Sequence, residues 1–272
     1  MTVEPDYVGA SYPGVRGQTM NGDLEGRLAS HLPSATSVLV VSAHPDDESF
    51  GLGGALGAFA DAGVLTSVLC FTRGEASTLG EDLESLAHVR STELGNAAVE
   101  LGVGHVELFE HPDLALADQE LAVLATQVCQ VADRVRADLL LVFDEGGITG
   151  HPDHQRATEA ALAFADGAGL PVLAWALNEQ VASSLNREFG TAFIGRPAEQ
   201  VEFEVSVDRA RQHRAIACHV SQATDNPVLR RRLALQGDRE VFRWLREPRP
   251  QRRACGVGAP APIHRSLQDE KG

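Results

Sequence analysis

Two short segments of the sequence concentrate the residue types that bind metals and move protons. The first, from Ala43 to Glu48, reads AHPDDE, and the second, from Gly150 to His154, reads GHPDH. A turn or a helix cap explains one acid of the first segment, but three consecutive acids repel one another unless a cation lies among them. A histidine nitrogen and a carboxylate oxygen are ligands suited to Zn²⁺. The first segment therefore predicts a metal site, to which it supplies two ligands, His44 and Asp47.

The second segment can complete this site. Catalytic zinc usually takes three protein ligands and keeps one position open for water. His151 and His154 are three residues apart, so at the start of a helix they lie on roughly one face. A lone histidine is more often an ordinary core or surface residue, but this is a pair at a predicted strand end. We expect one of the two to bind the metal and the other to face the substrate.

The first segment directly follows an apolar run typical of a buried parallel strand, and the second follows another such run after residues 144–149. Such runs alternate with stretches of helical periodicity along most of the chain. We predict strands over 37–43, 65–72, 106–109, 139–143, 171–176 and 201–207, and helices over 52–62, 83–101, 120–136 and 155–165. The alternation indicates an α/β fold with a Rossmann-like, mostly parallel sheet and helices on both faces. Function in such folds collects at the carboxyl ends of strands, where both segments lie.

The length of 272 residues favours one sizeable domain. No linker or internal repeat divides it. We predict an irregular N-terminal arm over 1–35, a single catalytic domain over 36–250 and a flexible tail over 251–272. The glycines at 51, 53, 54 and 57 do not form a dinucleotide-binding motif, because Leu56 stands where the last glycine is required.

Composition excludes several classes of partner. The net charge of −15 argues against nucleic acid, and no apolar run approaches the roughly 18–20 residues of a membrane span. A secretory signal is not expected, because the N-terminus carries Glu4 and Asp6 and no apolar segment follows. Four scattered cysteines fit reduced thiols, so we expect a cytoplasmic protein. Whether it forms a homo-oligomer stays open.

Arginine is concentrated near the C-terminus. Residues 209–253 hold twelve arginines and four acids, in a region where we expect helices. One interpretation is a solvated helical face. The other is that one or two of these arginines reach an anionic substrate or a partner subunit.

The paired motifs resemble those of the LmbE/PIG-L family of zinc-dependent N-deacetylases, over about residues 37–222. The resemblance implies removal of an acetyl group from an N-acetylglucosaminyl compound. It further implies that His44, Asp47 and His154 bind one Zn²⁺, for which Fe²⁺ or another divalent ion can substitute. Asp46 would be the general base, and His151 the acid or the stabiliser of the oxyanion. A carboxylate close to an activated water suits the first role without the family name.

Supporting roles are expected for five further residues. Glu48 orients His44 or Asp47 unless it only begins a helix, and Asp153 holds the tautomer of His151 unless it is a helix-start carboxylate. Arg73, Asp113 and His219 are candidates for substrate contact. A structural ion pair is the alternative for Arg73, and a buried hydrogen-bonded histidine is the alternative for His219.

Three functions are consistent with these motifs. The first is a de-N-acetylase acting on a small amino-sugar compound, and the second is an amidase acting on a mycothiol S-conjugate or another acyl amine. The third is a metal-containing binding module without turnover, against which the presence of both Asp46 and His151 argues. Thr149 stands where relatives acting on mycothiol precursors often carry tyrosine, which weakens an assignment to mycothiol chemistry.

Overall fold

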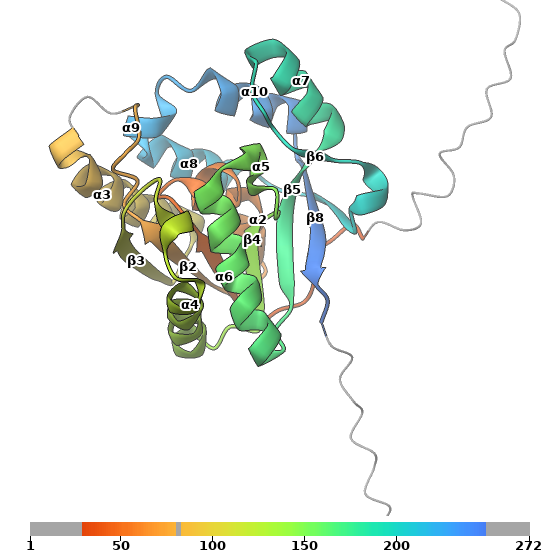
Figure 1. Ribbon diagram of the computed structural model, residues 1–272. Helices are drawn as coiled ribbons and strands as arrows, with labels where there is room; N and C mark the ends of the chain where they lie inside the picture. Colours follow the sequence, from red (N-terminus) through yellow and green to blue (C-terminus); the bar gives the residue numbers. More distant parts are fainter. Residues whose placement is uncertain (1–28, 80–82, 249–272) are drawn as a thin grey trace, which may run out of the picture.

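A twisted, mostly parallel sheet forms the centre of the molecule (Figure 1). The computed structural model describes residues 29–79 and 83–248, so most of the expected N-terminal arm and the whole expected tail lie outside the described residues. The strands are β1 (Ser37–Ser42), β2 (Leu65–Thr72), β3 (His105–His111), β4 (Leu139–Phe143), β5 (Val172–Asn178), β6 (Gly195–Arg196), β7 (Phe203–Ser206) and β8 (Arg239–Arg246). Their order is β3-β2-β1-β4-β5-β8-β7, with the short β6 paired to β5. The predicted α/β fold is confirmed.

Helices cover both faces of this sheet. They are α1 (Asp47–Phe50), α2 (Gly53–Asp61), α3 (Leu83–Leu101), α4 (Leu121–Val135), α5 (Gly147–Gly150), α6 (Pro152–Ala168), α7 (Glu179–Phe189), α8 (Ala210–Cys218), α9 (Val220–Ala223) and α10 (Pro227–Gln236). Two short 3-10 turns, Leu116–Asp118 and Ala198–Gln200, complete the element list. Among the described residues no helix has the length and apolarity to cross a membrane.

Successive side chains of β1 point to opposite faces of the sheet and so contribute to two separate cores. All six residues of this strand are buried, because it lies between two parallel neighbours and under helices on both sides. Val38 and Val40 face a core built with α2, α3, α7 and α8, whereas Leu39 and Val41 face a core built with α4 and α6. In Figure 1, α4 and α6 lie on the near face of the sheet.

The C-terminal part of the sheet differs from the sequence-based prediction. Residues 239–246 were expected in an Arg-rich helical region, but they form β8, which runs antiparallel to β5 and to β7. In the sequence REVFRWLR the charged and apolar residues do not alternate strictly, so the period of two that indicates a strand is missing. The helix α7 was also not predicted.

The strand order places the two motif loops next to each other. From β1 the chain moves outward through β2 and β3 and then returns to β4 on the other side of β1. The carboxyl ends of β1 and β4 are therefore the topological switch point, the usual position of a site in an open α/β sheet. AHPDDE follows β1, and GHPDH follows β4.

Candidate active site

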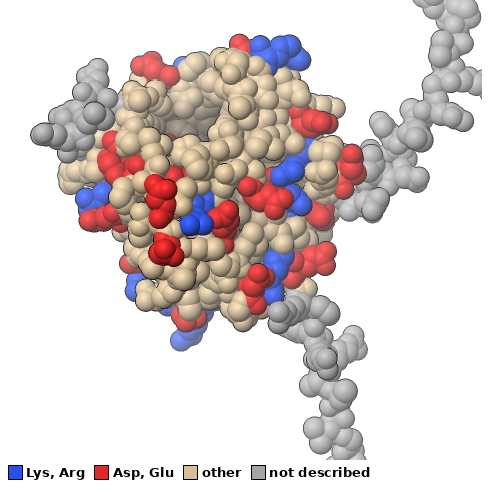
Figure 2. Space-filling model, in the orientation of Figure 1, with Lys and Arg blue, Asp and Glu red and all other residues tan. Residues whose placement is uncertain are grey.

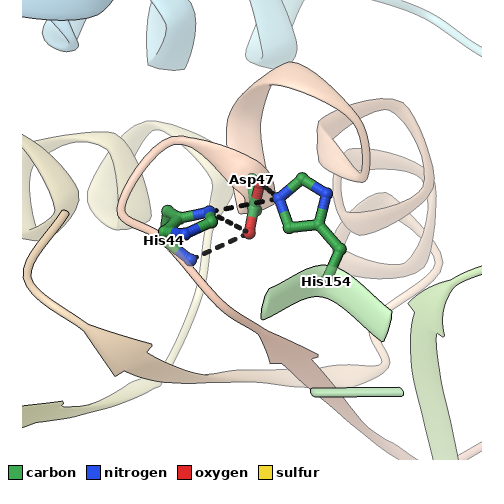
Figure 3. A group of neighbouring side chains, drawn as sticks. All are labelled: His44, Asp47 and His154. Carbon is green, nitrogen blue, oxygen red and sulfur yellow. Dashed lines mark hydrogen bonds and ion pairs between the residues drawn. The ribbon is translucent and has the colours of Figure 1, made fainter. Parts of the chain in front are cut away.

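Three side chains from the two motif loops converge at the switch point (Figure 3). His44 Nδ1 lies 3.1 Å from His154 Nε2, and His154 Nε2 lies 3.1 Å from Asp47 Oδ1. His44 Nδ1 is 3.8 Å from Asp47 Oδ2. Ligands about 2.0–2.1 Å from a tetrahedral Zn²⁺ stand roughly 3.3 Å from one another. The spacing of these three groups fits such an ion.

The hydrogen bonds of the two histidines fix which nitrogen faces this point. His154 Nδ1 lies 3.2 Å from the carbonyl oxygen of Gly147, so it carries the proton and leaves Nε2 with its lone pair. His44 Nε2 lies 3.1 Å from Asp113 Oδ1 and 3.4 Å from Asp153 Oδ2, so a proton on Nε2 leaves Nδ1 free. With both histidines neutral, two nitrogen lone pairs and a carboxylate oxygen would face one point, a donor set that binds a divalent cation.

The pKa values of the triad follow from the same contacts. Burial lowers the pKa of His44, but hydrogen bonds to Asp113 and Asp153 outweigh this and raise it to about 10. Burial raises the pKa of Asp47, but the charges of His154 and His44 outweigh it and hold this pKa below its usual range. Asp47 Oδ2 also accepts hydrogen bonds from the backbone N–H groups of Ala43 and His44. The carboxylate is thus kept ionised and fixed.

Asp46 adopts a backbone conformation that few residues tolerate. Its φ is 127°, in the left-handed region where a side chain is strained. Its N–H donates to Glu48 Oε2 at 2.9 Å, and its carbonyl accepts from Ser49 N and Phe50 N. These bonds hold the turn that brings Asp46 to the cavity beside Asp47.

Arg90 fixes the other end of the Asp46 side chain. Its Nη2 lies 3.0 Å from Asp46 Oδ2 and donates to the carbonyl of Pro45, while Nη1 donates to the carbonyl of Gly74. Burial raises the pKa of Asp46 to about 6, against the opposing charge of Arg90. The sequence placed Arg90 within the family resemblance but gave it no role, because its contact with Asp46 joins residues 44 positions apart.

His151 lies at the rim of the same group. Its ring centroid is 4.9 Å from those of both His44 and His154. The Nδ1 atom accepts a hydrogen bond from the backbone N–H of Asp153 at 3.2 Å, which leaves the proton on Nε2. Burial, His154 and His44 lower the pKa of His151, so the ring is neutral near pH 7.

Two supporting residues have other partners than expected. The Asp153 carboxylate faces His44 and accepts from the N–H groups of Leu114 and Leu116, while only its backbone contacts His151. The Glu48 carboxylate contacts neither His44 nor Asp47. It accepts from Ser49 Oγ and from the N–H of Asp46 and pairs with His219 Nε2 at 2.7 Å.

The three residues expected to contact substrate are divided. Asp113 lines the cavity, where one carboxylate oxygen meets His44 and the other accepts from the N–H of Ala76. Arg73 is outside the cavity lining and pairs with Glu110 at the surface. His219 is fully buried against Glu48 and Phe50. Arg73 and His219 therefore make the contacts of structural residues: a surface ion pair and a buried hydrogen bond.

A cavity of about 340 Å³ opens beside the triad, and Figure 2 shows a hollow on the side where α5, α9 and α10 lie in Figure 1. His44, Asp46, Asp47, His151 and His154 line one end. Much of the remaining wall is apolar and was not singled out from the sequence; it includes Phe50, Leu79, Leu114, Phe143, Ile148, Trp175, Phe193, Val228 and Leu229. Arg232 also belongs to this wall.

Comparison with known proteins agrees with the motifs. The model of the GlcNAc-PI de-N-acetylase family, PIG-L, matches residues 39–165. A protein of Bacillus anthracis named as a probable N-acetyl-alpha-D-glucosaminyl L-malate deacetylase 2 is 30% identical over 220 residues, which cover 78% of this chain and 92% of that relative. The chain belongs to the PIG-L family. The resemblance expected from AHPDDE and GHPDH is confirmed.

Other relatives are similar over different extents. A 1D-myo-inositol 2-acetamido-2-deoxy-alpha-D-glucopyranoside deacetylase of Kineococcus radiotolerans is 34% identical over 184 residues, 53% of this chain and 50% of that relative. The chain thus spans about half the length of this relative. The solved N,N'-diacetylchitobiose deacetylase of Pyrococcus horikoshii has a TM-score of 0.61 at 23% identity, covering 84% of this chain and 90% of that one. This likeness shows the shared fold.

Proposed function

We propose that the protein is a zinc-dependent hydrolase that removes the acetyl group from an N-acetylglucosaminyl-type compound. One observation carries the proposal. The metal-ligand atoms of His44, Asp47 and His154 lie at one end of a cavity whose rim also holds Asp46 and His151. The names of the B. anthracis and K. radiotolerans relatives support the amino-sugar substrate.

The three ligand side chains would hold one divalent ion. When bound, such an ion supplies Lewis-acid activation of a water molecule and of the amide carbonyl. Neutral imidazole nitrogens and one carboxylate favour Zn²⁺, and Fe²⁺ fits the same donor set. Asp113 and Asp153 keep His44 in the tautomer that this role requires.

Asp46 would act as the general base. Asp46 is next in the chain to Asp47, and the ion pair with Arg90 fixes the orientation of its carboxylate. It would take a proton from the attacking water. Glu48 and α1 hold the strained turn at Asp46, so the carboxylate would keep its position from one turnover to the next.

His151 would act on the other side of the scissile amide. Its Nε2–H is available to the cavity because Nδ1 is occupied by the N–H of Asp153. A hydrogen bond from this group would stabilise the developing oxyanion, and Asp46 would then deliver the proton taken from the water to the departing amine. The oxyanion donor and the proton carrier would thus come from two different loops.

Metal content and acetate release together test this function. We expect about one zinc per chain and acetate release from at least one simple N-acetylglucosaminide. Asp46→Asn should lower kcat by roughly 10²–10⁴ while the metal content stays unchanged. Asp118→Asn, which removes an exposed carboxylate outside the cavity lining, is the matched control.

Two outcomes would contradict the proposal in different ways. A zinc-loaded wild type that releases no acyl group from any N-acyl glucosaminide would leave a binding module as the better description. Loss of zinc in Asp46→Asn would mean that Asp46 is a ligand and not the base.

A further inference from the structure

One arginine of the Arg-rich segment differs from the others in its partners. Nine arginines between residues 209 and 246 lie in the described part of the chain, and seven of them form ion pairs with carboxylates. Arg230 is exposed and donates to the backbone carbonyls of Ala223 and Thr224. Arg232 is buried, and within residues 29–79 and 83–248 no carboxylate lies within ion-pair distance of it.

The surroundings of Arg232 satisfy only part of its guanidinium group. The side chain is 6% exposed, and its Nη2 donates to the carbonyl of Phe50. The carbon at the centre of the guanidinium lies 5.1 Å from the centroid of the Trp175 ring, within cation–π distance. Burial lowers the pKa of Arg232 to about 10, against the opposing charge of Glu240 and with Arg209 adding to the effect. Even so, the group stays a cation at neutral pH.

The carboxylate that could neutralise Arg232 is already occupied. Glu240 is 1% exposed, and Arg209 Nη1 pairs with its Oε1 while Trp175 Nε1 donates to its Oε2. Gln236 Nε2 also contacts Oε2 at 3.3 Å. One buried carboxylate thus lies near two buried guanidinium groups and forms an ion pair with Arg209 alone. This cluster carries one positive charge in excess, and Arg232 brings that charge to the cavity wall.

A wall of aromatic side chains connects Arg232 with the candidate metal site. The ring of Phe143 lies 4.9 Å from that of His154 and 5.6 Å from that of Trp175. Trp175 in turn lies under Arg232. Leu79 and Leu114, which also line the cavity, are 52% and 60% exposed. A molecule whose amide reached the triad would therefore place an apolar portion along these side chains before meeting Arg232.

We propose that Arg232 binds an anionic oxygen group, a carboxylate or a phosphate, on the aglycone of the amino-sugar substrate. The inference rests on the proposed deacetylase function and names the substrate class for the same cavity. A buried cation without a carboxylate partner is costly, and an oxyanion relieves that cost where a sugar hydroxyl does so only in part. The planar guanidinium also matches the two oxygens of such a group. The aglycone would have an apolar body ending in this anion.

Three matched glycosides test this inference. They are the 4-carboxyphenyl, 4-phosphonophenyl and 4-carbamoylphenyl glycosides of N-acetylglucosamine, together with their deacetylated amines. Binding of the amines to the zinc-loaded protein is measured by calorimetry, so that no turnover is required. We expect at least one anionic amine to bind roughly tenfold or more tightly than the carbamoyl amine. Comparing the carboxyphenyl amine with the phosphonophenyl amine shows which of the two anionic groups the protein prefers.

Variants on α10 assign the preference to Arg232. Arg232→Gln should reduce it to within about twofold, whereas Arg231→Gln should leave it unchanged. Arg231 is the matched control because it lies next on the same helix, loses the same charge and pairs with Glu188 at the surface. If Arg232→Gln does not fold, Arg232→Lys decides, because a single ammonium should lower the preference several-fold.

The outcomes distinguish this inference from the function on which it rests. Equal binding of the three amines by the wild type overturns the inference, as does an unchanged preference in Arg232→Gln or, if that variant does not fold, in Arg232→Lys. Acetate release from the carbamoylphenyl compound reports the deacetylase function separately. If this release occurs without any anion preference, the function stands and the role of Arg232 falls.

Discussion

The motif loops after β1 and β4 and the segment from α8 to β8 both bring buried charges to one cavity, but they hold these charges differently. In the loops, the nitrogens of two histidines face a carboxylate oxygen, and the three atoms form a donor set for a cation once both histidines are neutral. In the C-terminal segment, Arg209 and Glu240 are already paired. The first region is therefore arranged to receive a positive charge, and the second stabilises the fold and leaves the charge of Arg232 for an anion.

This difference predicts different consequences of substitution. Removing a ligand from the loops takes away one of the three groups that would hold the ion, so the effect should fall on metal binding. Removing a member of the C-terminal cluster leaves a buried charge without its partner, so the effect should fall on the free energy of unfolding.

The largest effect is expected at His154. His154→Ala removes one of three ligands, so we expect the zinc content to fall close to zero and acetate release to be lost with it. His151→Ala is the matched control from the same helix start, and it should keep the metal while slowing turnover. Metal analysis of the two purified variants checks the prediction. Full zinc content in His154→Ala would remove His154 from the ligand set.

The next effect is expected at Glu240 and concerns stability. Glu240→Gln leaves Arg209 and Arg232 buried without a carboxylate, which should lower the free energy of unfolding by about 3–5 kcal/mol. Glu204→Gln is the control, because Glu204 of β7 meets Arg239 of β8 in an exposed pair at 3.9 Å, worth less than about 1 kcal/mol. Urea unfolding of the three proteins measures both values. Similar losses in the two variants would contradict the contrast.

A smaller effect on the metal is expected at Asp153. Its carboxylate orients His44 and is itself held by two backbone N–H groups, so it supports a ligand without being one. Asp153→Asn should weaken zinc binding roughly 10–100-fold. Competition with a chelator of known affinity measures the change. Asp118→Asn should leave the affinity unaltered, and an unaltered affinity in Asp153→Asn would mean that Asp113 alone fixes His44.

The two regions also differ in what their sequence reveals. The site residues of the loops lie within six residues of one another in each motif, and each motif follows an apolar strand, so their meeting at the sheet edge followed from chain order. The direction of the Asp153 side chain did not, because its partner His44 is 109 positions away. Local spacing cannot encode such a contact.

In the C-terminal segment, residue type alone is uninformative. Arg232 is the last of three consecutive arginines, and only packing against Trp175 and Phe50 distinguishes it from its neighbours. The strand β8 escaped prediction for a similar reason. Its charged residues are tolerated inside the sheet because Glu240 and Arg243 have partners on β5, directly after β4 and directly before α8, and no local pattern displays these contacts.

The last prediction concerns His219, which links the two regions because it lies beyond α8 and contacts Glu48 of α1. Burial lowers the pKa of His219, but the Glu48 carboxylate at 2.7 Å outweighs this and raises it above the ordinary value of 6.5. In the window from pH 6.5 up to this raised pKa, the folded state holds more protons than the unfolded state. Its stability should therefore fall as the pH rises through that window.

His219→Gln should cost about 1.5–3 kcal/mol at pH 6, where the wild-type pair is charged, and less at pH 9. His213→Gln on the exposed side of α8 is the control and should show the same pH dependence as the wild type. Unfolding at saturating zinc is measured at both pH values. A cost that is the same at pH 6 and pH 9 would mean that the proton on His219 does not contribute, and that the contact with Glu48 acts as a neutral hydrogen bond. The loop that carries Asp46 would then be held by packing and by the hydrogen bond from Asp46 N–H to Glu48, and not by an ion pair between Glu48 and a protonated His219.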